Sequence, residues 1–306
     1  MMGERLANLG ALLVMPFVLH GIINRVKSLW SGRKGPPILQ LLYDVIRLLR
    51  KSSVYSSTTT PLFRIAPYVL LVTAVSSAAI APLLGSTPLA SFPFDFVWLA
   101  YAWGLGRMAI MLAAMDTGSS FEGMGAAREA TFSTLVEPAW FLIVGALCLV
   151  SRTHTLHEAL APRLDNGAAV VVWGCAIVAL TIVLQVEAAR MPIDDPATHL
   201  ELTMVHEVMV LDHSGPDLAV IHTAAAVKLF VGSSIIATLL NPWAGVSTLR
   251  SALANVALCI AVAVTLGTVE SLVARLRLRT VPQYVVVALA SGVVALLATA
   301  WRGGAQ

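Results

Sequence analysis

The sequence predicts an all-α fold: a polytopic integral membrane bundle of about eight transmembrane helices, with amphipathic helices in its cytoplasmic loops. Two observations carry this prediction. The chain of 306 residues is 58% hydrophobic and only 12% charged, whereas soluble domains contain roughly 25% charged residues. Several apolar runs also reach the roughly 20 residues that a helix needs to cross a bilayer core. No long polar linker divides the chain, so we expect residues 1–306 to form a single membrane domain.

We expect eight spans in order along the chain. They lie near residues 5–24, 62–84, 94–115, 132–151, 168–188, 221–240, 252–272 and 282–301. The first run lacks a small-residue cleavage site, so we expect a retained helix rather than a cleaved signal. Glycine and proline occur inside several runs, which membrane helices tolerate.

Lysine and arginine gather in the loops 25–61 and 273–281. With eight spans, these two loops lie on one side of the membrane, and the positive-inside rule makes that side cytoplasmic. The loops 116–131 and 189–220 then also face the cytoplasm, and both termini face outward. Acidic residues do not set topology, so the acidic character of 189–220 needs a separate reason.

The first cytoplasmic loop contains an expected surface helix. Gly35-Pro36-Pro37 breaks the chain, and Leu39, Leu42, Ile46 and Leu49 then recur at helical spacing. Such a pattern indicates a short amphipathic helix on the membrane surface. Two interpretations stay open, a basic anchor on anionic lipid and a docking surface for a partner. The polar residues that we assign to docking here are Arg33, Lys34, Gln40 and Asp44.

The stretch 187–217 is the most polar part of the chain, and apolar spans lie on both sides of it. From Arg190 onward it carries six carboxylates, three histidines and one arginine. We expect Glu187 and Arg190 to pair, because residues three apart share a helix face. A new helix should follow over 197–211, with Asp195 as its N-cap. We interpret the whole stretch as a polar funnel at the mouth of the bundle, which includes Asp194, Asp195 and Asp212.

Histidines and carboxylates of this stretch suggest proton transfer. His199, Glu201, His206 and Glu207 do not form the H-E-x-x-H pattern of a zinc site, so we predict no metal site. Histidine titrates near neutral pH, which suits a proton relay. The alternative is an ordinary solvated face of a loop helix.

Charged residues inside the spans provide candidates for an ion path. Glu137 and Lys228 lie within expected spans, where an uncompensated charge costs a few kcal/mol. Glu137 either pairs with Arg128 or serves as a proton site, whereas we interpret Glu270, close in sequence to basic residues, as a paired interfacial charge. We predict a hydrated polar line that leads from Glu187 and Glu201 inward to Glu137 and Lys228. The basic neighbours of Glu270 are Arg275 and Arg277.

The three cysteines are Cys148, Cys175 and Cys259, and each stands alone in an apolar run. This spacing provides neither an iron–sulfur nor a zinc ligand set. We therefore expect any redox metal centre to belong to another subunit. We assign no catalytic residue and no directly bound cofactor to this chain, and we leave quinone binding open.

The central loop resembles a motif of the membrane subunit shared by respiratory complex I, its subunit-one or H-type protein, and energy-converting nickel–iron hydrogenases. That motif reads R-x-P-F-D-x-P-E-A-E-x-E-L. Ile193, Ala197 and His199 replace its aromatic residue and two of its glutamates. The run 194–207, D-D-P-A-T-H-L-E-L-T-M-V-H-E, resembles the formate hydrogenlyase branch. The matching positions are Arg190, Pro192, Asp194, Pro196, Glu201 and Leu202, with Asp212-His213-Ser214-Gly215 similar to E-Y-S-G and Gly35-Pro36, Gln40, Asp44 and Leu48 similar to the first-loop motif.

The resemblance covers nearly the whole chain and implies a non-catalytic subunit of an oxidoreductase complex in a prokaryotic inner membrane. Such a subunit anchors a peripheral redox arm and couples electron transfer to proton or sodium movement. The implied partners are a hydrogenase-like large subunit with a nickel–iron centre, an iron–sulfur small subunit, antiporter-like membrane subunits and the lipid bilayer, with no nucleic acid.

Two alternatives remain open on the sequence. One is the quinone-site subunit of NADH:quinone oxidoreductase, although the departures from the motif fall where complex I shapes its quinone tunnel. The other is a free-standing secondary transporter, in which inverted repeats are common; we detect none in this sequence.

Overall fold

The computed structural model contains only helices and connecting segments in the part of the chain that it describes. Eight helices are long and apolar enough to cross a membrane, which confirms the predicted fold class and the number of spans. These helices are α1 (Met2–Trp30), α3 (Pro61–Ile80), α4 (Asp95–Asp116), α5 (Ser120–Ser151), α7 (Gly167–Glu187), α8 (Gly215–Leu240), α9 (Leu249–Leu272) and α10 (Val281–Gly304). The structure describes residues 2–85, 87–161, 165–194, 204–244, 249–274 and 276–304.

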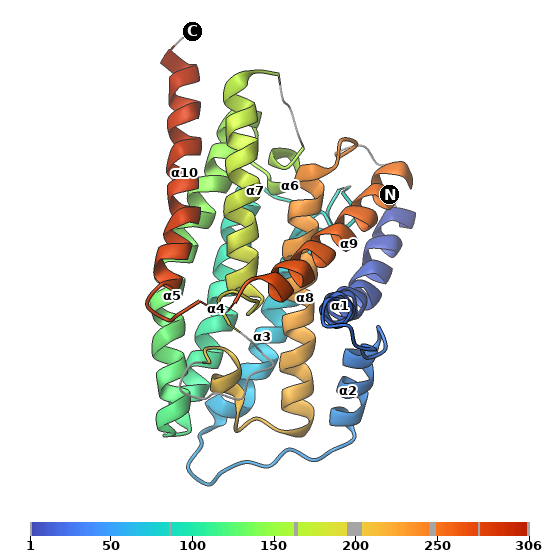
Figure 1. The fold of residues 1–306 in the computed structure, drawn as a ribbon, viewed down its shortest axis with the longest axis vertical. Helices are drawn as coiled ribbons and strands as arrows, with labels where there is room; N and C mark the ends of the chain where they lie inside the picture. Colours follow the sequence, from blue (N-terminus) through green and yellow to red (C-terminus); the bar gives the residue numbers. More distant parts are fainter. Residues whose placement is uncertain are drawn as a thin grey trace.

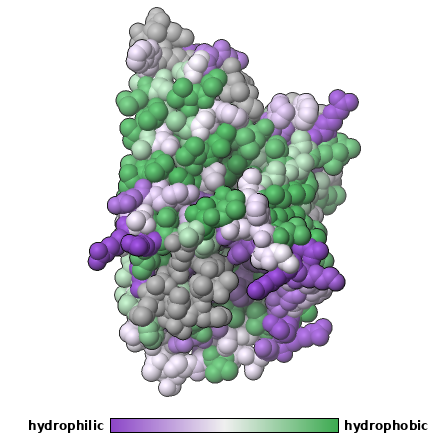
Figure 2. Space-filling view, in the orientation of Figure 1, coloured by the Kyte–Doolittle hydropathy of each residue, from purple (hydrophilic) through white to green (hydrophobic). Residues whose placement is uncertain are grey.

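Helix α8 forms the centre of the bundle and is buried along most of its length. It packs against α3, α9, α1 and α7, and Figure 1 shows it between the α4–α5–α7–α10 group and the inclined pair α1 and α9. Hydrophobic side chains cover broad parts of the visible outer surface of the helices (Figure 2). Large exposed apolar areas of this kind mark a surface that contacts a membrane or a partner, so the fold is that of a multi-pass membrane protein.

Short helices connect the spans. The segment α2 (Gln40–Leu49) is the amphipathic helix predicted in the first loop, with Val45 buried and Ile46 and Leu49 exposed. It packs against α8 and α1. The other two short helices are α6 (Leu156–Ala159) and the 3₁₀ helix η1 (Glu207–Val210).

Helix α5 begins at Ser120 rather than near residue 132, so most of the expected flexible loop is helical. Alanines in this segment favour helix formation. Gly125 faces η1 so closely that an added Cβ would overlap a methyl group of Val208. The glycine therefore serves close packing of η1 on α5, and two glutamates of the first turns, Glu122 and Glu129, are brought into the bundle.

The prediction of a helix over 197–211 is wrong for residues 204–211, the part of this range that the structure describes. In that part the only helical segment is η1. The carboxylate of Asp194 accepts hydrogen bonds from the backbone N–H groups of Val205 (3.1 Å) and His206 (2.8 Å). Short acidic side chains compete in this way with helical backbone bonding. The segment therefore folds around Asp194.

Candidate functional site

Arg107 of α4 is the centre of a buried ionic network. Its Nη2 lies 2.6 Å from Glu137 and its Nε lies 3.7 Å from Glu129, both on α5, and its Nη1 contacts Glu187 at the end of α7. Arg107, Glu129 and Glu187 are almost fully buried, whereas the side chain of Glu137 is 42% exposed. Arginine is suited to this place because its planar fork offers five donors and keeps its charge when buried.

Lys228 extends the network onto α8. Its Nζ lies 2.7 Å from Oε2 of Glu187, so Glu187 bridges Lys228 and Arg107. The ammonium also lies 5.4 Å from the ring centre of Trp103. The charge of this intramembrane lysine is thus compensated by a carboxylate.

His206 joins the network to the central loop. Its Nε2 lies 3.2 Å from Glu129 and its Nδ1 lies 3.5 Å from Asp194. Burial opposes protonation of His206, but the carboxylates of Glu129 and Asp194 outweigh this effect and raise its pKa above 6.5. Burial likewise opposes ionisation of Asp194, yet its hydrogen bonds with His206 lower the pKa of the carboxyl group. His206 is thus a titratable link between two acids.

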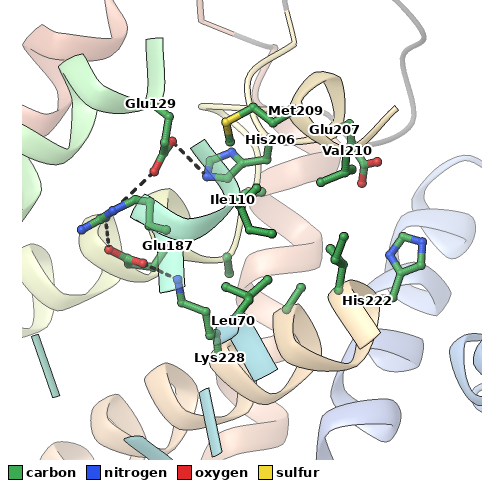
Figure 3. A pocket seen from close by; sticks show the side chains of 15 residues that line it. Leu70, Ile110, Glu129, Glu187, His206, Glu207, Met209, Val210, His222 and Lys228 are labelled. Atoms are coloured by element: carbon green, nitrogen blue, oxygen red, sulfur yellow. Dashed lines mark hydrogen bonds and ion pairs between the residues drawn. The ribbon is translucent and has the colours of Figure 1, made fainter. Parts of the chain in front are cut away.

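We call Arg107, Glu129, Glu137, Glu187, His206 and Lys228 the Arg107 cluster. Figure 3 shows Glu129, Glu187, His206 and Lys228 of this cluster. It holds two cations and three carboxylates, and the buried carboxylate of Asp194 adjoins it, 3.5 Å from His206. Carboxylates therefore outnumber the permanent cations, and protonation of His206 reduces this excess of negative charge by one.

A cavity of about 120 Å³ borders the cluster. Glu129, Glu187, His206 and Lys228 line one side, and Glu207 and His222 lie at the other (Figure 3). A water molecule needs roughly 10–15 Å³ of such space and a few polar partners. The cavity thus has the size and the lining to hold several waters beside the cluster.

A second buried ionic group lies between α1, α9 and the loop after α7. Glu270 is fully buried and lies 3.0 Å from Lys27 and 3.6 Å from Arg190. Nη2 of Arg190 donates to Nδ1 of His20 at 2.8 Å. Because a guanidinium can only donate, His20 accepts this bond and is assigned as the neutral Nε2–H tautomer. We call these four residues the Glu270 cluster.

A third polar group surrounds the start of α8. His213 stacks on Phe63 at 3.9 Å between ring centres, and burial lowers its pKa to about 4. Oε1 of Glu122 accepts the backbone N–H of Asp212 at 3.0 Å, and Asp217 accepts the hydroxyl of Tyr68 at 3.3 Å. These contacts secure the chain where the central loop enters α8.

The predicted pair of Glu187 and Arg190 is wrong. Ala189 has a positive φ of 51°, so the helical spacing that should align the two residues ends before Arg190. Glu187 turns to Arg107 and Lys228, and Arg190 turns to Glu270 and His20.

Two other charged side chains take partners from distant parts of the chain. Of the two alternatives for Glu137, the structure does not show the pairing with Arg128: Arg128 donates to the carbonyl of Met204 at 2.7 Å, and Glu137 pairs with Arg107. Glu270 is a paired charge, as expected, and in the described part of the chain its partners are Lys27 and Arg190. Of its basic neighbours in sequence, Arg275 lies outside the described residues. In both cases tertiary packing supplies a partner from another helix or loop.

The remaining predicted site residues have separate places. Glu207 lines the cavity, whereas Asp212 is exposed. Gln40 donates to Asp44 at 3.2 Å within α2, and Asp44 pairs with Arg47 at 3.0 Å, so these residues bond locally. Arg33 and Lys34 line an open groove at the end of α1. Asp195, His199 and Glu201 lie outside the described residues.

Sequence reasoning missed Arg107, Glu129, Glu122 and His20. Arg107 lies inside an apolar run, and the cost of a lone intramembrane charge was a signal that could have singled it out. Glu122 and Glu129 fell in the segment interpreted as a loop. Within the described residues, no three His, Cys, Asp or Glu side chains are grouped as metal ligands.

The fold and these clusters define a multi-pass helical membrane protein with buried ionic networks inside its bundle. The family model described as NADH dehydrogenase matches residues 5–300, and the chain belongs to this family. The resemblance to the H-type protein of complex I, in its hydrogenase branch, is thereby confirmed together with the relatives that follow.

Three relatives cover most of the chain. Formate hydrogenlyase subunit 4 of Escherichia coli (strain K12) is 27% identical over 280 residues, which is 87% of this chain and 88% of that protein. Hydrogenase-4 component C of the same organism is 28% identical and covers 78% of this chain and 75% of its own length. The H-type subunit of the NADH-quinone oxidoreductase of Salinibacter ruber is 24% identical over 76% of this chain and 69% of that protein.

A solved structure shares the fold. A chain of the membrane-bound sulfane sulfur reductase, an archaeal respiratory membrane complex, superposes with a TM-score of 0.74 over 96% of this chain and 99% of that chain. Its sequence identity is 19%, so this likeness concerns the arrangement of helices alone.

Proposed function

We propose that this chain is the membrane subunit of a complex I-like, energy-converting hydrogenase of the formate hydrogenlyase type. It anchors a peripheral redox arm and links electron transfer in that arm to movement of protons or sodium ions. The observation that carries the proposal is the Arg107 cluster, in which buried carboxylates and a titratable histidine run from the central loop into the bundle. The two hydrogenase-related proteins of E. coli support the choice of complex.

The cluster offers a path for a proton in three steps. His206 takes up a proton at the loop, where Asp194 and Glu129 stabilise the imidazolium. Arg107 holds Glu129, Glu137 and Glu187 around one guanidinium, so a charge change at one carboxylate alters the proton affinity of the others. Glu137, the most exposed of the three, is the exit toward the outer face of α5.

The partners follow from the same proposal. A hydrogenase-like large subunit carries the nickel–iron centre, a small subunit carries iron–sulfur clusters, and antiporter-like subunits extend the membrane part. Arg190 and Asp194 are buried, so they hold the central loop in shape and leave contact with the arm to exposed residues. The loops that dock the arm face the cytoplasm of a prokaryotic cell, and both termini face outward.

Replacing Glu137 with Gln tests the coupling. The variant keeps the shape and hydrogen-bonding capacity of the side chain but removes its titration. We expect an assembled complex in proteoliposomes to move fewer ions per electron, or to turn over more slowly. Glu158→Gln, an exposed position on α6 outside the cluster, is the matched control. Unchanged coupling in a fully assembled Glu137→Gln complex would refute the path.

The cavity favours a second candidate, the quinone-site subunit of an NADH:quinone oxidoreductase. Apolar side chains such as Leu70, Ile110 and Ile221 line it beside a few charged groups, which is the usual composition of a small-molecule site. Quinone content and inhibitor sensitivity of the purified complex separate the two candidates. On the hydrogenase proposal the complex holds no stoichiometric quinone and resists quinone-site inhibitors.

A further inference from the structure

An open groove of about 640 Å³ lies at the end of α1, beside the end of α9. It is separate from the cavity of the Arg107 cluster, with which it shares no lining residue. Three basic side chains line the groove, and its other described lining residues include no carboxylate. These basic residues are Lys27, Arg33 and Lys34.

Backbone geometry fixes the position of the basic residues. Gly32 has a φ of 65°, its N–H bonds to the carbonyl of Leu29, and the N–H of Arg33 bonds to the carbonyl of Ser28 at 2.9 Å. This pair of bonds is the Schellman motif that ends a helix. The motif reverses the direction of the chain at Gly32. Arg33 and Lys34 therefore lie beside the last turn of α1 and line the groove.

The two residues have charge available for a ligand. Lys27 is already paired with Glu270 at 3.0 Å. Arg33 and Lys34 are exposed, and their side chains form no ion pair or hydrogen bond with the described part of the chain. Arg25 lies close by, and its Nη1 donates to the carbonyl of Gly35 at 3.3 Å. The groove therefore presents a concentrated positive charge that the described residues do not neutralise.

Apolar surface continues directly from the groove. Leu29 and Trp30 on α1 and Leu272 on α9 are all more than half exposed. Figure 2 shows hydrophilic side chains gathered near the end of α1 and on α2, with hydrophobic surface of α1 and α9 beside them. Tryptophan is typical of the membrane–water interface. A ligand that fills this place must carry negative charge at one end and be apolar at the other.

We propose that the groove binds the phosphate group of an anionic phospholipid, with the acyl chains lying along the apolar surfaces of α1 and α9. Basic pockets between membrane helices on the cytoplasmic side bind anionic headgroups by this chemistry. A soluble acidic peptide would match the basic residues but would leave the adjoining apolar surface uncovered. The juxtaposition of charge and apolar surface therefore favours a lipid over a peptide.

The test compares lipid retention by the purified, assembled complex in native mass spectrometry, with phosphatidylglycerol or phosphatidylcholine added to the detergent. We expect the wild-type chain to retain phosphatidylglycerol in preference. The variant R33Q/K34Q should lose this preference by roughly thirtyfold, because each basic residue near the membrane surface contributes about a fivefold effect. The control R50Q/K51Q removes two exposed charges from the same loop outside the groove and should retain the lipid as the wild type does.

Three results would overturn the proposal. Equal retention of phosphatidylglycerol by the wild type and R33Q/K34Q would remove the groove as its site. Displacement of the lipid by inorganic phosphate at equal concentration would identify a free anion as the ligand. Loss of the peripheral arm from R33Q/K34Q, with lipid retention unchanged, would assign the groove to protein docking.

Discussion

The Arg107 cluster and the Glu270 cluster both flank the loop after α7, but they combine charges in opposite ways. The Arg107 cluster has three carboxylates for two permanent cations, with a titratable histidine between two acids. The Glu270 cluster has one carboxylate between two cations, and its histidine is held neutral as an acceptor. An excess of carboxylates over cations favours the uptake of a proton, whereas an excess of cations opposes it.

This difference separates two roles for buried charge. In the Glu270 cluster, Arg190 and Lys27 converge on one carboxylate and tie the loop to α9 and α1, which is a structural lock. In the Arg107 cluster the charge balance changes with the state of His206, beside a cavity with room for water. Buried ion pairs contribute little net stability, so such a cluster is better explained by charge handling than by stability.

Removing the central residue of each cluster should have the largest effects on stability. Arg107→Gln leaves Glu187 with Lys228 alone and takes the guanidinium away from Glu129 and Glu137, and breaking a buried ionic network costs about 3–5 kcal/mol. Glu270→Gln leaves two cations, of which Lys27 can extend into water, so we expect about 1–3 kcal/mol. Thermal unfolding of the purified chain in detergent measures both. A larger loss of stability for Glu270→Gln than for Arg107→Gln would contradict the ranking.

The histidines sharpen the comparison through pH. The pKa of His206 is higher in the folded chain than in the unfolded chain. Protonated His206 therefore stabilises the folded state fully at pH values below the unfolded pKa of about 6.5. This stabilisation is lost as the pH rises through the folded-state pKa. We expect the free energy of unfolding of the wild type to fall by about 1–2 kcal/mol as the pH rises above about 6.5. His206→Gln should abolish this dependence of stability on pH.

His20→Gln is the matched control, because glutamine also offers Arg190 an acceptor. We expect the dependence of stability on pH to persist in this variant, measured as the unfolding midpoint at a series of pH values. A wild-type midpoint that stays level above the unfolded pKa of histidine, or a slope that survives His206→Gln, would show that His206 does not titrate between Glu129 and Asp194.

The helices could be predicted from composition, but the clusters could not be derived from spacing. Hydropathy alone locates the eight spans, because each crosses the membrane independently of the others. The partners of Glu187 and Arg190 depend instead on the turn at Ala189 and on Arg107, Glu270 and His20 from other helices. The rule that residues three apart on one helix can pair does not predict contacts between different helices.

Glu129 is a second residue whose place in the site could not be predicted from the sequence. On the sequence alone we assign 116–131 to a loop between spans, yet Gly125 in this segment allows η1 to pack closely on α5. In a membrane bundle small residues often mark close helix packing rather than flexibility. Lys228 could be singled out as an intramembrane charge that needs compensation, because the cost of burying it does not depend on which helix supplies the partner. That its partner is Glu187 could not be derived from the sequence.

The smallest effect should come from Lys27, and it decides which cation holds Glu270. Distance favours Lys27, at 3.0 Å against 3.6 Å for Arg190, but the Lys27 side chain is 28% exposed and that of Arg190 is buried. Water screens an exposed charge, so Lys27→Gln should cost less than about 1 kcal/mol. Arg190→Gln, which removes a buried guanidinium 3.6 Å from Glu270, should cost more. A smaller loss of stability for Arg190→Gln than for Lys27→Gln would mean that distance, rather than burial, sets the strength of these pairs.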